Sequence, residues 1–241
     1  MQTTNVIGAS KASPFSALIT MFYDPYRAFH MLERRRFAWL PLVLVTLCSF
    51  ALYVWYFSVV DFFWLSDQIL TTISDAEQRA QAEKVVSKDM MTGTTMMTVI
   101  FTPLFFAMLT GLYFAIIGKI RNDDFGFAKG FALSLWASVP NVFLLVLGGM
   151  QILLTSGGQF DPSHLNPVSM NQLFFHLEMG NAWAGFLDSI NVLSIWNIVL
   201  TIIGYKVWSK VSRQSAVKVV VIPYVIIYIG WAVINVMSKA A

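Results

Sequence analysis

Four side chains of types that bind metals or move protons fall close together in one stretch of the chain. Asp161 and His164 form an Asp-x-x-His pair, and His176 and Glu178 form a His-x-Glu pair further along. Zinc sites use local ligand pairs of recognisable spacing, and neither pair has one of the strong spacings. A metal-dependent activity is therefore one hypothesis of function, and it depends on these residues alone.

Motifs that identify an enzyme are missing from the rest of the sequence. There is no Walker phosphate loop, no Gly-x-Gly-x-x-Gly after a strand, no CxxC pair and no His-Glu-x-x-His. A Gly-x-Ser-x-Gly element is also lacking. We therefore expect a protein that is not an enzyme, with no catalytic residues, no metal and no cofactor.

The composition is typical of a membrane protein. Of 241 residues, 57% are hydrophobic and 12% are charged, whereas soluble domains carry about 25% charged residues. So few charges do not cover the surface of a soluble globule. The net charge of +3 fits basic loops beside anionic lipid, so we infer no nucleic-acid partner. The single cysteine, Cys48, leaves no internal disulfide.

Five apolar runs are long enough to cross a bilayer, which takes about 20 residues. We expect an all-α polytopic membrane protein, a bundle of five transmembrane helices with long loops at 61–95 and 155–188. The first run is too long and too far along the chain for a signal peptide, whose apolar core has about 7–15 residues near the N-terminus. The predicted spans are 37–60, 96–118, 131–154, 189–207 and 216–237.

Lysines and arginines divide unevenly between the two sides of these spans. Twelve fall on the side of the N-terminus and four on the other. Because basic residues concentrate in the cytoplasm, the predicted orientation is N-in and C-out, with both long loops outside. In the first loop, 65–91 is predicted to be one helix with a capping box at Ser74 and Glu77. In the second, 170–188 is predicted to be an interfacial or re-entrant helix.

The segment before the first span, 1–36, is predicted to be a cytoplasmic amphipathic segment, apart from the transmembrane domain 37–237. Ser13-Pro14 and Asp24-Pro25 each read as an N-cap followed by a first-turn proline, which predicts two short helices with a break at Asp24 and Pro25. Such helices lie in the membrane interface or dock on a partner helix, and both readings stay open. The arginines next to the span also fit a plain topology anchor. The predicted lipid or partner contacts are Tyr26, Arg27, Phe29, Arg34, Arg35 and Arg36.

Polar groups inside the spans are mostly amides and hydroxyls. Spans one, two, three and five have no Asp, Glu, Lys, Arg or His in their interiors, which argues against a proton-coupled transporter. Amides and small residues within spans usually join helices, and prolines bend them. The predicted packing or kink residues are Pro103, Pro140, Asn141, Asn197, Gly204 and Pro223.

Short motifs are spread along residues 14–236. They are DPYRAF at 24–29, FAWLPL at 37–42, SDAEQ at 74–78, WASVP at 136–140, SIW at 194–196 and Gly204. Together they resemble the bacterial branch of the Yip-domain family, five-span membrane proteins related to the eukaryotic Ypt/Rab-interacting proteins. The eukaryotic Asp-Leu-Tyr-Gly-Pro signature is absent. The resemblance implies the inner membrane of a bacterium and casts doubt on a direct Rab-GTPase role.

The favoured hypothesis is a non-enzymatic scaffold or accessory subunit in membrane trafficking, transport or envelope processes. It would organise the lipid bilayer or bind other integral membrane proteins, such as a transporter or export complex, and a homo-oligomer is a further option. The alternative is a small-molecule permease component. It ranks second because five spans do not divide into two equal inverted repeats.

Overall fold

The computed structural model describes residues 13–34 and 37–240. Within these residues five helical segments are long and apolar enough to cross a membrane, which confirms the predicted all-α, five-span architecture. The span-forming helices are α3 (Trp39–Val59), α6 (Lys88–Arg121), α7 (Phe127–Ala137) continued by α8 (Phe143–Leu154), α10 (Val192–Ser209) and α11 (Arg213–Ala240).

Three of the span-forming helices begin earlier than predicted, and α11 does so at Arg213 rather than at 216. The helix α6 starts at Lys88 rather than at 96, because the Ser87 hydroxyl accepts a hydrogen bond from Met90 N (3.2 Å) and caps a polar first turn. The third span starts at Phe127 rather than at 131. It is broken in the middle by the 3₁₀ turn η1 (Val139–Val142), where Pro140 has no N–H to continue the helix.

The first long loop is not the single helix predicted for 65–91. It contains α4 (Phe62–Thr71) and α5 (Ala76–Val85), and its last residues already belong to α6. The cap of α5 is Asp75 rather than Ser74, since the Asp75 carboxylate accepts from Gln78 N at 2.8 Å. That part of the prediction was wrong.

The second long loop is built mainly of short turns. Two 3₁₀ turns, η2 (Ser156–Gly158) and η3 (Pro162–Leu165), come first. The predicted helix at 170–188 is reduced to the single turn η4 (Asn171–Phe175) and the short α9 (Ala184–Ser189). Gly180 lies between them with a φ of +93°, a conformation that interrupts any helix.

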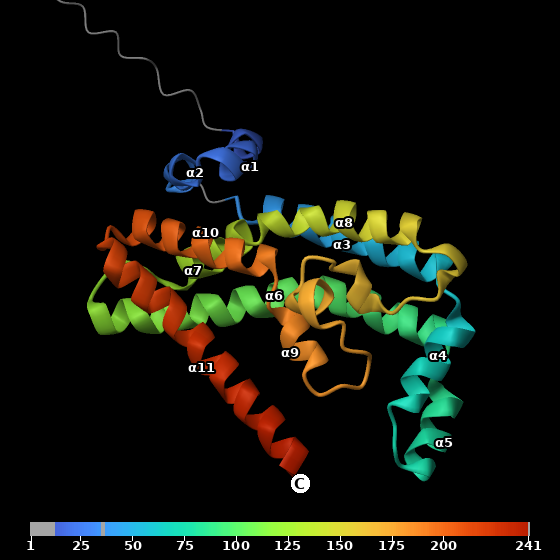
Figure 1. Cartoon of the computed structure of the whole chain (residues 1–241). Coiled ribbons are helices and arrows are strands. Elements are labelled where there is room, and N and C mark those ends of the chain that lie inside the picture. The colour runs from blue at the N-terminus through green and yellow to red at the C-terminus, as the bar shows by residue number, and fades with distance from the viewer. Residues whose placement is uncertain (1–12, 35–36, 241) are drawn as a thin grey trace, which may run out of the picture.

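The two short helices before the first span form a helical hairpin, α1 (Pro14–Tyr23) and α2 (Pro25–Leu32). The predicted break is confirmed: Asp24 N donates to Thr20 O (2.8 Å), while the Asp24 carboxylate accepts from Arg27 N (3.0 Å). Asp24 therefore ends one helix and caps the next. The hairpin lies on one flank of the bundle, above α10 and α7 (Figure 1).

Buried apolar side chains gather in two clusters, one in each half of the bundle. The helices α7 and α10 pack together in the hairpin half, while α3 and α8 pack together in the loop half. The helix α11 diverges from the others toward its C-terminal end (Figure 1). The hairpin cluster is Ala17, Met21, Ala28, Phe29, Leu32, Leu40, Phe114, Phe125, Ala132, Leu133, Trp136, Ala137, Val139, Leu200, Tyr205, Val207, Trp208, Ala216 and Val220. The loop cluster is Leu52, Tyr56, Phe57, Val60, Leu65, Ile152, Phe160 and Leu165.

Candidate functional site

The hairpin is attached to the bundle through Phe29. This side chain is fully buried, and its ring packs edge-on against Trp208 of α10, with centroids 5.5 Å apart. The Trp208 indole N–H also donates to the Phe29 carbonyl at 2.8 Å. At the end of α2 the Glu33 N–H turns to His30 O, so the Phe29 carbonyl has lost its usual in-helix partner. Trp208 therefore supplies the hydrogen-bond donor that the last turn of α2 lacks, and it fixes the position of this helix.

Gly204 provides the space that the Phe29 ring occupies. A Cβ at this position would lie 2.4 Å from Leu133 Cδ1 and 2.6 Å from Phe29 Cε1, both too short for any real contact. The absence of a side chain on α10 thus allows α2 and α7 to meet there. The structure brings together Gly204 and Phe29, which the sequence assigned to separate roles.

The predicted contact surface needs one correction. Phe29 was expected to face lipid or a partner, but it is fully buried because its ring fills the space beside Gly204. Tyr26 is 51% exposed, and the side chains of Arg27 and Arg34 are also exposed. The two remaining predicted contacts, Arg35 and Arg36, lie outside the described residues.

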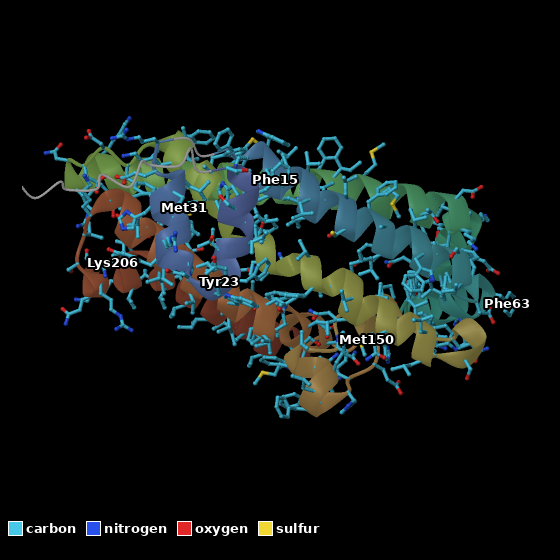
Figure 2. All side chains as sticks on the ribbon, turned by 90° about the horizontal axis from the view of Figure 1, so that it is seen from above. Phe15, Tyr23, Met31, Phe63, Met150 and Lys206 are labelled. Carbon is cyan, nitrogen blue, oxygen red and sulfur yellow. The ribbon has the colours of Figure 1, made fainter. Side chains whose placement is uncertain are left out.

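An apolar stripe that the sequence reading missed runs along the outer face of α1. Phe15, Ile19 and Tyr23 recur every four residues and are 60–69% exposed. The helix carries no charged residue, and Tyr26 on α2 is exposed as well. Figure 2 shows Phe15 and Tyr23 on the hairpin, seen from above. An apolar outer face on a docked helix suits the interfacial region of a bilayer.

A trough separates α2 from the end of α10. Its walls carry Tyr26, His30 and Glu33 from the hairpin side and Lys206 and Lys210 from the α10 side, around a cavity of about 480 Å³. The Lys206 ammonium lies 5.5 Å from the centre of the Tyr26 ring, and the His30 ring packs edge-on against Tyr26. Tyr26 was predicted as a contact residue, whereas the two lysines counted only among the basic residues that set the orientation. Lys206 lies in the last turn of α10 and Lys210 is its C-cap, so two lysines four residues apart near the end of a predicted span were the available signal.

The two amides predicted to pack helices meet at the break in the third span. Asn197 of α10 hydrogen-bonds to Asn141 of η1 at 3.0 Å. With both amides turned over, the Asn197 nitrogen donates to Ala137 O (2.8 Å) and Leu193 O (3.1 Å), and the Asn197 oxygen accepts from Asn141 at 3.0 Å. Asn141 N bonds to Ser138 O, so Ala137 O has lost its regular helical donor. The turned amide satisfies that carbonyl within the membrane, where an unpaired one is costly.

The predicted prolines fall in different settings. Pro140 lies in η1, at the break between α7 and α8. Pro103 and Pro223 lie inside α6 and α11, each of which continues as one helix past its proline.

The four candidate metal ligands line one pocket of about 250 Å³ beside α4. His164 Nδ1 lies 3.3 Å from the Asp161 carboxylate, which also accepts from Ser163 N at 2.8 Å. Burial opposes ionisation of Asp161, but the hydrogen bonds from His164 and Ser163 outweigh it and lower its pKa. The bond to Asp161 raises the pKa of His164. Within the described residues no three His, Cys, Asp or Glu side chains are placed to share a metal ion, so the metal hypothesis gains no support.

A comparison with known families identifies the fold. Residues 19–234 match the family model of the Yip1 domain. The chain belongs to the Yip1 domain family. The matched region begins within α1 and ends within α11, so it includes α2 and all five spans. The Yip1 family is a family of membrane proteins, and this chain is an integral membrane protein. No curated protein and no solved structure matches it.

Proposed function

We propose that this Yip1-domain protein is a non-enzymatic scaffold or accessory subunit of a bacterial inner membrane, oriented N-in and C-out. Its hairpin contacts lipid and other integral membrane proteins from the cytoplasmic side. One observation carries the proposal: the hairpin is held on the bundle by a buried phenylalanine, while its outer face presents both apolar and basic groups.

A docked contact surface has a physical advantage over a flexible one. Because Phe29 and Trp208 already hold α2 in place, little backbone freedom is lost when Tyr26, Arg27 and Arg34 meet a partner. The arginines also attract anionic headgroups, each worth about 1 kcal/mol near a membrane surface. The hairpin thus combines fixed geometry with electrostatic attraction.

A permease component is the second candidate, and a groove between α6, α10 and α11 is the observation in its favour. The groove has a volume of about 340 Å³ and is lined mostly by apolar side chains, among them Phe106, Phe114 and Ile227. Such a lining suits an alkyl chain better than a polar solute. The groove therefore supports contact with lipid at least as well as transport.

Co-purification tests the proposal. The tagged chain is extracted in polymer nanodiscs, and companions are quantified for the wild type, for Arg27→Gln with Arg34→Gln, and for the control Arg79→Gln with Lys84→Gln on α5. We expect stoichiometric companions that fall about fivefold for each hairpin charge removed, and that stay constant in the control. Orientation is checked in each variant. Wild-type companions retained in full by the hairpin variant would overturn the proposal.

A further inference from the structure

The trough between α2 and α10 has the features of an anion site. Lys206 lies in the last turn of α10, Lys210 directly follows the helix as its C-cap, and both residues line the hollow. His30 faces it from α2. Lysine ammonium groups bind phosphate as compact point charges. We infer that this trough binds the phosphate of a membrane phospholipid, which deepens the proposed function by naming the lipid contact.

The lysines of the trough make no ion pair with any of the residues that the structure describes. Within the described residues no carboxylate lies within 4.0 Å of the Lys206 or Lys210 nitrogen, and the nearest acid of the trough, Glu33, is instead 3.8 Å from His30. The Tyr26 ring holds Lys206 in place by a cation–π contact rather than by a charge. Two lysines therefore share a cavity with a single carboxylate, Glu33, which makes no ion-pair contact with either of them.

Acidic groups in a neighbouring hollow limit the negative charge that a ligand of the trough can carry. A second hollow of about 320 Å³ adjoins the trough through Glu33 and Lys210, and it carries Asp123 and Asp124 beside Lys129. Asp123 is already 3.6 Å from Arg121. A phosphodiester carries a single negative charge for the two trough lysines to neutralise, whereas a nucleotide with several charges would face these carboxylates. The charge pattern favours a phospholipid over a soluble polyphosphate.

The apolar surroundings favour a phosphate that carries acyl chains. Tyr26 lines the trough and is itself exposed, and α1, the helix before it, carries the exposed stripe of Phe15, Ile19 and Tyr23. Val207 and Val211 line the opposite wall. Figure 2 shows Lys206 beside the hairpin that carries Phe15 and Tyr23. A lipid whose headgroup enters the trough can therefore lay its chains along an apolar surface.

Native mass spectrometry of the full chain in detergent tests the inference. Phosphatidylglycerol is titrated against the wild type, Lys206→Gln with Lys210→Gln, and the matched control Lys119→Gln with Lys218→Gln. We expect affinity for the lipid to fall at least tenfold in the trough variant, to stay within twofold in the control, and to be kept by Lys206→Arg with Lys210→Arg. Equal losses in both glutamine variants, or no loss in the trough variant, would overturn the site.

Two further probes identify the part of the lipid that is bound. Diacylglycerol has the chains without the phosphate, and we expect it to bind at least tenfold more weakly than phosphatidylglycerol. Glycerol 3-phosphate has the phosphate without chains, and we expect it not to compete at equal concentration. Equal binding of diacylglycerol would overturn the phosphate site, and effective competition by glycerol 3-phosphate would overturn the lipid as its source. Companions that persist in the trough variant would separate failure of this site from failure of the proposed function.

Discussion

The two halves of the bundle fasten distant segments of the chain by the same device. In the hairpin half, Trp208 packs edge-on against Phe29 and donates to its carbonyl at 2.8 Å. In the loop half, Tyr56 packs edge-on against Phe160 and donates to its carbonyl at 3.0 Å. One aromatic side chain thus supplies both apolar contact and a donor for a buried backbone carbonyl.

The two halves differ in the kind of segment that is fastened. Trp208 holds a complete helix, and the cluster around it includes residues from the hairpin and several spans. Tyr56 holds an irregular loop, and its cluster is smaller. A rigid hairpin can present a constant surface, whereas a loop held at one point retains more local freedom. This difference is the reason for assigning contact function to the hairpin half.

The largest expected effect comes from filling the space beside Phe29. Gly204→Ala places a methyl group against Leu133 and Phe29, so we expect a loss of about 3 kcal/mol in the free energy of unfolding and release of the hairpin. Thermal unfolding in detergent and protease sensitivity of α1–α2 measure both. Gly230→Ala is the control, because its Cβ would meet nothing within 4 Å. Equal behaviour of the two variants would contradict the docking.

A smaller loss in the free energy of unfolding is expected from a substitution in the loop half. Tyr56→Phe keeps the ring against Phe160 but removes the donor, so the buried carbonyl loses its partner. We expect about 1–2 kcal/mol of destabilisation, with faster amide hydrogen exchange in residues 156–165 and unchanged exchange in the hairpin. Tyr26→Phe, at an exposed ring, should change neither. Exchange that rises equally in both halves would show that the two clusters are not independent.

The pair of amides at the break between α7 and α8 should contribute still less to the free energy of unfolding. A double-mutant cycle with Asn141→Ala and Asn197→Ala measures the coupling between η1 and α10. We expect about 0.6 kcal/mol, and at most about 1.7, because polar contacts within membranes rarely exceed this. A coupling of zero would show that the contact of 3.0 Å between the two amides adds nothing to helix packing.

The smallest effect is a pH dependence in the loop half. His164 has a pKa raised above its ordinary 6.5 by Asp161, so its stabilisation is complete below about pH 6.5 and is lost as pH rises through the raised value. The pKa of Asp161 is lowered, so this carboxylate contributes stability at pH values above its ordinary pKa of 3.8. Burial raises the pKa of the nearby Asp188, so two carboxylates change charge together in acid. The loss of stability at alkaline pH therefore tests the His164–Asp161 pair most directly.

The alkaline limb is measured by following protease resistance of the 155–191 loop from about pH 6 to pH 9. We expect a modest decline in the wild type and a flat profile in His164→Gln, since the pair is partly exposed and screened by solvent. His176→Gln is the matched control and should decline like the wild type. A flat wild-type profile would remove any energetic role for the pair.

Sequence patterns predicted best the features that depend on local composition. The spans followed from long apolar runs, and the turn at Asp24-Pro25 followed from a cap and a proline next to each other. The burial of Phe29 was missed because its partners, Gly204 and Trp208, come from the other end of the chain. No local pattern records which side chain will face a glycine so distant in sequence.

The predictions for the first long loop and for the trough were wrong or incomplete for a related reason. The predicted helix at 65–91 has helical spacing through Ile69 and Ile73, but separate caps at Asp75 and Ser87 divide it into pieces. The trough lysines were assigned to orientation because their neighbours Tyr26 and His30 come from the hairpin. Local signals gave the elements, while the site depends on contacts between elements.

Thiol labelling tests the account most directly, because the central claim is that one face of α2 docks inward with Phe29 while Arg27 faces the cytoplasm. In a Cys48→Ala background, Arg27→Cys and Ala28→Cys are treated with a membrane-impermeant maleimide in inverted and right-side-out vesicles; Ala28 is as fully buried as Phe29, and its replacement keeps the Phe29 ring. We expect Arg27→Cys to react only in inverted vesicles and Ala28→Cys to react only after denaturation. Reaction of Ala28→Cys as fast as Arg27→Cys, or of Arg27→Cys only in right-side-out vesicles, would contradict the account.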